Sequence, residues 1–248
     1  MITRNDYLAY SIGSLIVAAV GLVFGDFALQ WQPVPADFPL RPALAYAANA
    51  LLFILGIATL LPRTARTALV ALASFYSVWA VVLHVPRIIG EPANVSIWLG
   101  LAEIAALAAA GWMARFTQQP DASHARWLRL AQIVFSGCLL LFGLSHFVYA
   151  DFTATMIPAW LPFPLFWAYF TGVGHVAAGL SLLTNIAARL ACTLLAAMFA
   201  SFVLLLHLPR VFASPTVHAE WLMLGVATAL TGAAWIVRAV TVPRTWIR

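Results

Sequence analysis

Apolar stretches alternate with short polar segments along the whole chain. A helix of about 20 apolar residues crosses the ~30 Å hydrocarbon core of a bilayer, whereas a spanning β-strand needs only about 10 residues of alternating polarity. The length of the stretches and their Leu, Ala and Val content therefore predict an all-α, polytopic membrane protein. We expect eight transmembrane helices, at 7–25, 42–61, 67–85, 95–114, 130–149, 164–184, 190–208 and 219–237.

The pattern of the first half of the chain returns in the second half. Leu-His-Val-Pro-Arg at 83–87 recurs as Leu-His-Leu-Pro-Arg at 206–210, and a proline and a tryptophan follow at equal spacing in both halves. The offset is 123 residues, as from His84 to His207. Such self-similarity indicates a duplicated unit. We predict two four-helix bundle repeats, residues 1–120 and 121–248, which are parallel because each contains an even number of spans.

Composition leads to the same class of protein. Hydrophobic residues make up 64% of the chain and charged residues 8%, and the mean hydropathy is +0.95. This is too little polar surface to cover a soluble globule. The lipid bilayer is therefore an expected partner.

The net charge of +5 comes from arginines with a lopsided distribution. In an eight-span arrangement most arginines lie on the side of the two termini, and only Arg41, Arg87 and Arg210 lie on the other side. The positive-inside rule then places both termini in the cytoplasm, as in a multi-pass protein of a bacterial-type plasma (inner) membrane. Because topology explains the basic charge, we do not expect nucleic-acid binding.

Most of the unusual polar residues fall at the extracytoplasmic ends of the predicted spans. The aspartates are expected to close the first helix of each half, and the His-x-Pro-Arg segments to close the third, because proline disfavours continuation of a helix. The Pro-rich loops between the first two spans of each half predict stiff, extended caps. The polar set comprises Asp26, His84, Arg87, Asp151, His207, Arg210 and Glu220.

Two interpretations of this set stay open. In one, the residues terminate helices, pair with one another and anchor the chain at the membrane surface. In the other, each half forms an extracytoplasm-facing pocket in which aspartate accepts a proton, while His and Arg donate hydrogen bonds to an anionic or quinone-like oxygen. The recurrence of arginine at 87 and 210, against the positive-inside tendency, favours the pocket.

Three ionisable residues lie deeper in the spans and are not duplicated. They are Glu103, His146 and His175, and their counterparts in the other half are valine, glycine and leucine. A charged group at such depth costs roughly 2.5–3.5 kcal/mol on insertion scales, so each needs a partner, neutrality or a water-filled cavity. They are candidates for a specialised site in the second half, or for neutral hydrogen bonds across a helix interface.

Metal and disulfide sites have little support in the sequence. The histidines of the second half are expected at different depths, with no i, i+4 pair to hold a metal, and no haem signature is present. Cys138 and Cys192 are also expected at different depths, as packing residues. A quinone is compatible with the polar pocket, and no other cofactor is indicated.

Several short motifs resemble those of DoxX-like membrane proteins. In the second half these are His-Phe at 146–147, Pro-Ala-Trp-Leu-Pro at 158–162, Gly-His-Val-Ala-Ala-Gly-Leu at 174–180 and Ala-Arg-Leu-Ala at 188–191. The first half resembles the same four-helix unit. The resemblance implies a DoxX-like bundle in tandem, and the family is named for a subunit of a membrane thiosulfate:quinone oxidoreductase.

Three functions stay open at this point, and only some of them are enzymatic. The leading expectation is a component of a quinone- or thiol-linked redox system that works with a protein partner. The second is a secondary transporter of a small solute, in which Glu103 and His175 couple protons. The third is a non-catalytic membrane assembly factor or scaffold.

Overall fold

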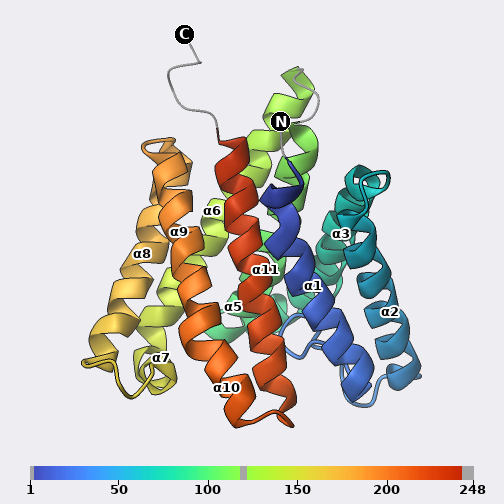
Figure 1. Cartoon of the computed structure of the whole chain (residues 1–248), viewed down its shortest axis with the longest axis horizontal. Coiled ribbons are helices and arrows are strands. Elements are labelled where there is room, and N and C mark those ends of the chain that lie inside the picture. The colour runs from blue at the N-terminus through green and yellow to red at the C-terminus, as the bar shows by residue number, and fades with distance from the viewer. Residues whose placement is uncertain (1–2, 118–121, 242–248) are drawn as a thin grey trace.

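The computed structural model describes residues 3–117 and 122–241, and that part of the chain is helical, without strands (Figure 1). Eight of its helices are long and apolar enough to cross a membrane, which confirms the predicted all-α class and the predicted number of long apolar helices. Six of these are single α-helices: α1 (Arg4–Phe24), α2 (Arg41–Leu60), α5 (Val95–Phe116), α6 (Ala122–Val148), α8 (Pro164–Thr184) and α11 (His218–Val240).

The other two long helices each contain a π-helical turn at the same place in the repeat. The first joins α3 (Ala65–Trp79), η1 (Ala80–His84) and α4 (Val85–Gly90), and the second joins α9 (Ala188–Phe202), η2 (Val203–His207) and α10 (Leu208–Ala213). Both π turns end on the histidine of the repeated Leu-His pair.

These two helices do not stop at the His-x-Pro-Arg segments, so that prediction was wrong. Pro86 and Pro209 lie in the first turn of α4 and α10, where the missing N–H leaves no hydrogen bond unmade. The π turn before each proline changes the hydrogen-bond register and lets the helix continue. Each helix therefore continues for three residues beyond its His-x-Pro-Arg segment, to Gly90 and Ala213.

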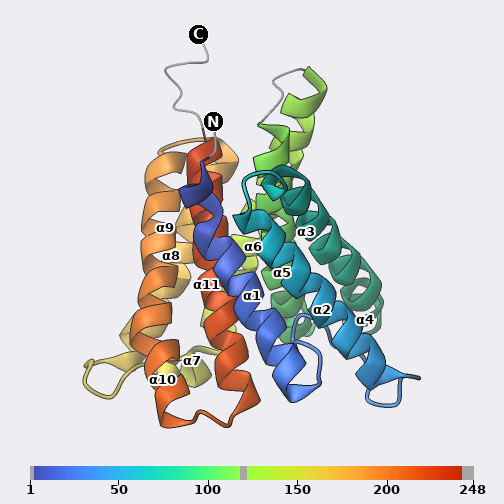
Figure 2. The same cartoon turned by 45° about the vertical axis from the view of Figure 1, so that its right-hand side comes forward.

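The helices of the two halves interlock. Within each half the long helices pack on their sequence neighbours, but the most extensive contacts are those of α1 with α11, α5 with α6 and α6 with α8. The last helix of each half thus lies along the first helix of the other half, and α5 also packs on α11 (Figures 1 and 2). The bundle is closed by contacts between the halves rather than within them.

Small residues allow the close approach of α1 and α11. A methyl group added at Gly232 would overlap the backbone of Tyr10, and one added at Gly13 would overlap the backbone of Ala229. Without a hydrophobic force between helices in lipid, such close backbone packing is a main source of helix association.

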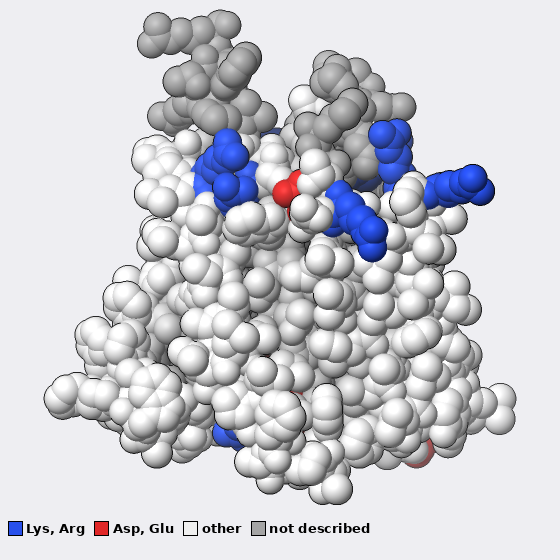
Figure 3. All heavy atoms as spheres, viewed as in Figure 1, with Lys and Arg blue, Asp and Glu red and all other residues white. Residues whose placement is uncertain are grey.

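The two ends of the bundle differ in charge. Both described ends of the chain lie at one end of the bundle, together with the turns at 61–64 and 185–187 (Figure 1). On the face drawn in Figure 3 the arginines gather at this end, and only one small basic patch is seen at the opposite end. This agrees with the lopsided distribution expected from the sequence.

The loops between the first two spans of each half are not the extended caps that proline content predicted. The first loop folds inward through successive turns and buries Phe27 and Trp31, whose rings lie 5.8 and 5.7 Å from those of Trp79 and Tyr76. The second contains a short helix, α7 (Ala150–Met156), so Asp151 lies in α7 instead of closing α6. Burial of aromatic rings against α3 outweighs the stiffness of proline in the first loop.

We expect Gly232→Ala to destabilise the protein by about 1–3 kcal/mol, because α1 must move away from α11 to admit the methyl group. Thermal unfolding of the purified protein in detergent measures the effect as a lower midpoint. Gly137→Ala in α6 is the matched control, since nothing lies within 4 Å of the added carbon. Equal midpoints for the two variants would contradict the packing described here.

Candidate functional site

A cavity of about 510 Å³ lies among the helices of the second half, in the size range of small-molecule sites. Residues of α6, α8, α9, η2 and α11 form its walls, the segment around α7 lies at the end opposite the termini, and α5 contributes from the first half. Four residues singled out from the sequence line it, namely Glu103, His146, His175 and His207. The remaining surface is mostly aromatic and aliphatic.

His175 is the most deeply buried polar group of the cavity, with 1% of its surface exposed. Its Nδ1 lies 2.9 Å from the carbonyl oxygen of Thr171, one turn earlier in α8. The Nε2 atom on the other edge of the ring is buried and makes no hydrogen bond. The rings of Phe142 and Phe199 flank the imidazole, with centroids at 5.6 and 5.4 Å.

His146 lies beside His175, with 5.0 Å between the ring centroids. Its Nδ1 lies 3.2 Å from the carbonyl oxygen of Ala168 and 3.0 Å from the hydroxyl of Thr171. The prediction that depth would keep these histidines apart was wrong. His146 is near the end of α6, but the chain continues beyond it through α7 and the following loop. His146 therefore lies at the depth of the middle of α8.

Glu103 enters the cavity from the first half of the sequence. Its counterpart in the repeat, Val226, lines the same cavity from α11. Both are present because α5 and α11 pack on one another at the centre of the bundle. The site is therefore composite, with one carboxyl from α5 lining a cavity whose histidines belong to the second half.

The equivalent space in the first half is filled by Trp31. Its ring packs on Tyr76, and its carbonyl oxygen lies 3.1 Å from Nε2 of the fully buried His84. The counterparts of Tyr76 and His84 in the repeat are Phe199 and His207, which both line the cavity. The inward-folded first loop thus occupies the place that is open in the second half.

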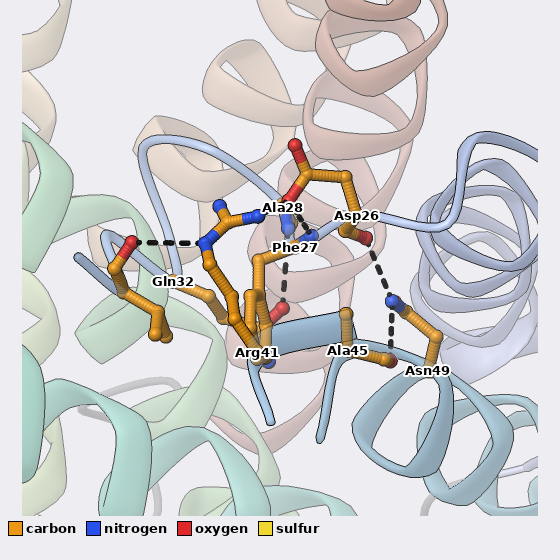
Figure 4. A network of polar contacts seen from close by, with 8 residues as sticks. Asp26, Phe27, Ala28, Gln32, Arg41, Ala45 and Asn49 are labelled. Carbon is orange, nitrogen blue, oxygen red and sulfur yellow. Dashed lines mark hydrogen bonds and ion pairs between the residues drawn. The ribbon is translucent and has the colours of Figure 1, made fainter. Parts of the chain in front are cut away.

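An ion pair holds this loop in place (Figure 4). Arg41 at the start of α2 lies 2.6 Å from Asp26, whose backbone carbonyl accepts a hydrogen bond of 2.9 Å from Asn49. Asn49 also donates to the carbonyl oxygen of Ala45. These contacts fix the start of the loop to the first turns of α2.

The pocket predicted for the first half from Asp26, His84 and Arg87 is not formed. Asp26 pairs with Arg41, His84 is buried under Trp31, and Arg87 is exposed on α4. The sequence pattern placed these residues at one end of the bundle but did not reveal that an inserted loop would separate them.

In the second half, three of the predicted residues lie outside the cavity. Arg210 makes a bidentate ion pair with Glu220, with N–O distances of 2.8 and 2.7 Å. Asp151 is exposed in the first turn of α7. The interpretation of paired helix ends therefore fits Arg210, and the pocket interpretation fits His207.

Sequence reasoning missed the residues that orient the histidines and form the walls. Thr171 lies four residues before His175, so an i, i+4 search on α8 could have found it. Phe142, Phe199 and Ser145 carry no signal of their own among so many apolar and small residues. Among the described residues, no three His, Cys, Asp or Glu side chains are placed to hold a metal ion, and both cysteines are buried and free.

Comparison with known proteins gives one partial match. Residues 135–238 match a family described as a domain of unknown function (DUF8561). The match covers less than half of the chain, and it includes His146, His175 and His207 but not Glu103. No curated protein and no solved structure matches the chain.

We expect Trp31→Ala to destabilise the protein by about 3–5 kcal/mol, because it leaves a cavity beside Tyr76 of α3 and His84 of η1. The measurement is the thermal unfolding midpoint in detergent. Trp160→Ala, at a position 68% exposed, is the control and is expected to leave the midpoint nearly unchanged. A small effect at Trp31 would show that the loop does not fill the first half.

Proposed function

We propose that this protein is a multi-pass membrane protein that binds a small, mostly apolar molecule with an oxygen-bearing polar head, of the quinone class, in the cavity of the second half. The observation that carries the proposal is the pair of neighbouring imidazoles, His146 and His175, in a mostly apolar cavity that Glu103 also lines. Polar groups at such depth are costly unless they serve a ligand, a proton path or another partner.

The division of roles within the cavity follows from its chemistry. Phe142, Phe199 and Phe202 provide flat apolar surface for a ring, while the histidines and Glu103 provide hydrogen bonds at one end. Oxidation or reduction of a quinone moves protons together with electrons. We infer that this chain holds the ligand and exchanges its proton, and that a partner protein supplies or removes the electrons, as the DoxX-like motifs suggest.

Binding of decylubiquinone to the purified full-length protein tests the proposal. Calorimetric titration in detergent is expected to give saturable binding, and Val226→Phe, which fills the cavity, should weaken it at least tenfold. Val173→Phe is the matched control, because Val173 is 58% exposed on α8 and does not line the cavity. Absence of binding to the wild-type protein, or equal loss in both variants, would refute the proposed site.

A second function is supported by the same cavity. Glu103 and His175 are ionisable, come from different halves and line one internal space, which suits a proton-coupled carrier of a small solute. Proton-linked uptake into vesicles that Glu103→Gln abolishes would favour the carrier over the redox component.

We also propose that both termini are cytoplasmic and that the α7 end of the cavity faces the opposite side, since arginines favour the cytoplasmic side. A cysteine in place of exposed Ala93 should react with a membrane-impermeant maleimide in intact cells, and one in place of exposed Arg63 only after lysis. The wild-type protein is the control, because Cys138 and Cys192 are buried. The reverse pattern of labelling would show that the protein has the opposite orientation in the membrane.

A further inference from the structure

The hydrogen bond of His175 to its own helix fixes which ring nitrogen carries the proton. The carbonyl oxygen of Thr171 can only accept, so Nδ1 of His175 is the donor across the 2.9 Å contact. In a neutral imidazole the other nitrogen then has a free lone pair. This nitrogen, Nε2, is buried without a partner.

The same argument applies to His146. The hydroxyl of Thr171 donates to the carbonyl oxygen of Trp167 at 2.8 Å, which leaves its oxygen as an acceptor. Nδ1 of His146 therefore donates toward Ala168 and Thr171, and its Nε2 is also an acceptor. Two neighbouring imidazoles thus each have an acceptor nitrogen at Nε2.

The nearby hydroxyl groups of the protein do not satisfy these acceptors. The hydroxyl of Ser145 donates to the carbonyl oxygen of Phe142 at 2.7 Å, and that of Thr171 is used within α8. A buried acceptor without a donor is unfavourable, so a ligand that brings a donor gains more from this site than one that brings only carbonyl or ether oxygens. This is the reverse of the donor role that the sequence suggested for the histidines.

We propose that the cavity recognises a phenolic hydroxyl group, which donates its hydrogen bond to Nε2 of His175. An aromatic alcohol suits both parts of the site, because its ring can pack against the cavity wall that includes Phe142, Phe199 and Phe202, while its hydroxyl donates to the imidazole. The inference rests on the proposed function, since it assumes that a ligand occupies this cavity. It narrows the ligand to the hydroxyl-bearing, reduced type of head group.

A pair of probes that differ only in the donor tests the inference. The purified full-length protein in detergent is titrated calorimetrically with 4-pentylphenol and with 4-pentylanisole, in which a methyl group replaces the hydroxyl hydrogen. We expect the phenol to bind at least tenfold more tightly. Equal affinity, or tighter binding of the ether, overturns the inference while leaving decylubiquinone binding, and thus the proposed function, intact.

Variants locate the effect within the molecule. His175→Phe should reduce the ratio of the two affinities to about one, whereas His218→Phe should keep it, because His218 stacks on Phe24 outside the cavity. If His175→Phe does not elute as a single folded species, the ratio of the two affinities measured with the wild-type protein decides. Binding of neither probe nor decylubiquinone would refute the proposed function and this inference together.

Discussion

The packing of each half's last helix on the other half's first helix determines the rest of the structure. Because α1 lies along α11 and α5 along α6, the bundle closes only when both halves are present. The same arrangement brings α5 and α11 together at the centre, which carries Glu103 into a cavity built mostly by the second half. Glycines at the α1–α11 contact make this approach possible, since larger side chains would hold the backbones apart.

The two halves of the chain have matching helices and different interiors. The π turns, the following prolines and the histidines at their ends recur in both. In the first half an inserted loop carries Trp31 inward, and His84 binds its backbone. In the second half the corresponding segment forms α7 at the surface, and the space stays open above it. One histidine of the repeated pair has thus become a packing residue, while the other lines a cavity.

The sequence predicts the parts of this structure that depend on local length and polarity. Span number, helix type and the asymmetric arginines follow from hydrophobic stretches and charge alone. The continuation through Pro86 does not, because it depends on a shift of backbone hydrogen bonds over the preceding turn. The contact of His146 with His175 also escapes prediction, because the depth of a residue counted from the helix ends ignores α7. The presence of Glu103 in the same cavity depends on the packing of α5 on α11, which the sequence does not reveal.

The antiparallel contact of α1 with α11 has a consequence for the order of the chain. It matches the contact of α5 with α6, and the described ends of the chain lie at the same end of the bundle as the last residues of α5. A linker between the ends of α11 and α1 would therefore be as short as a natural helical hairpin, and the chain could begin at α6 instead. The order of the helices around the bundle is therefore nearly that of a closed ring, and a circularly permuted chain could keep the same helix contacts.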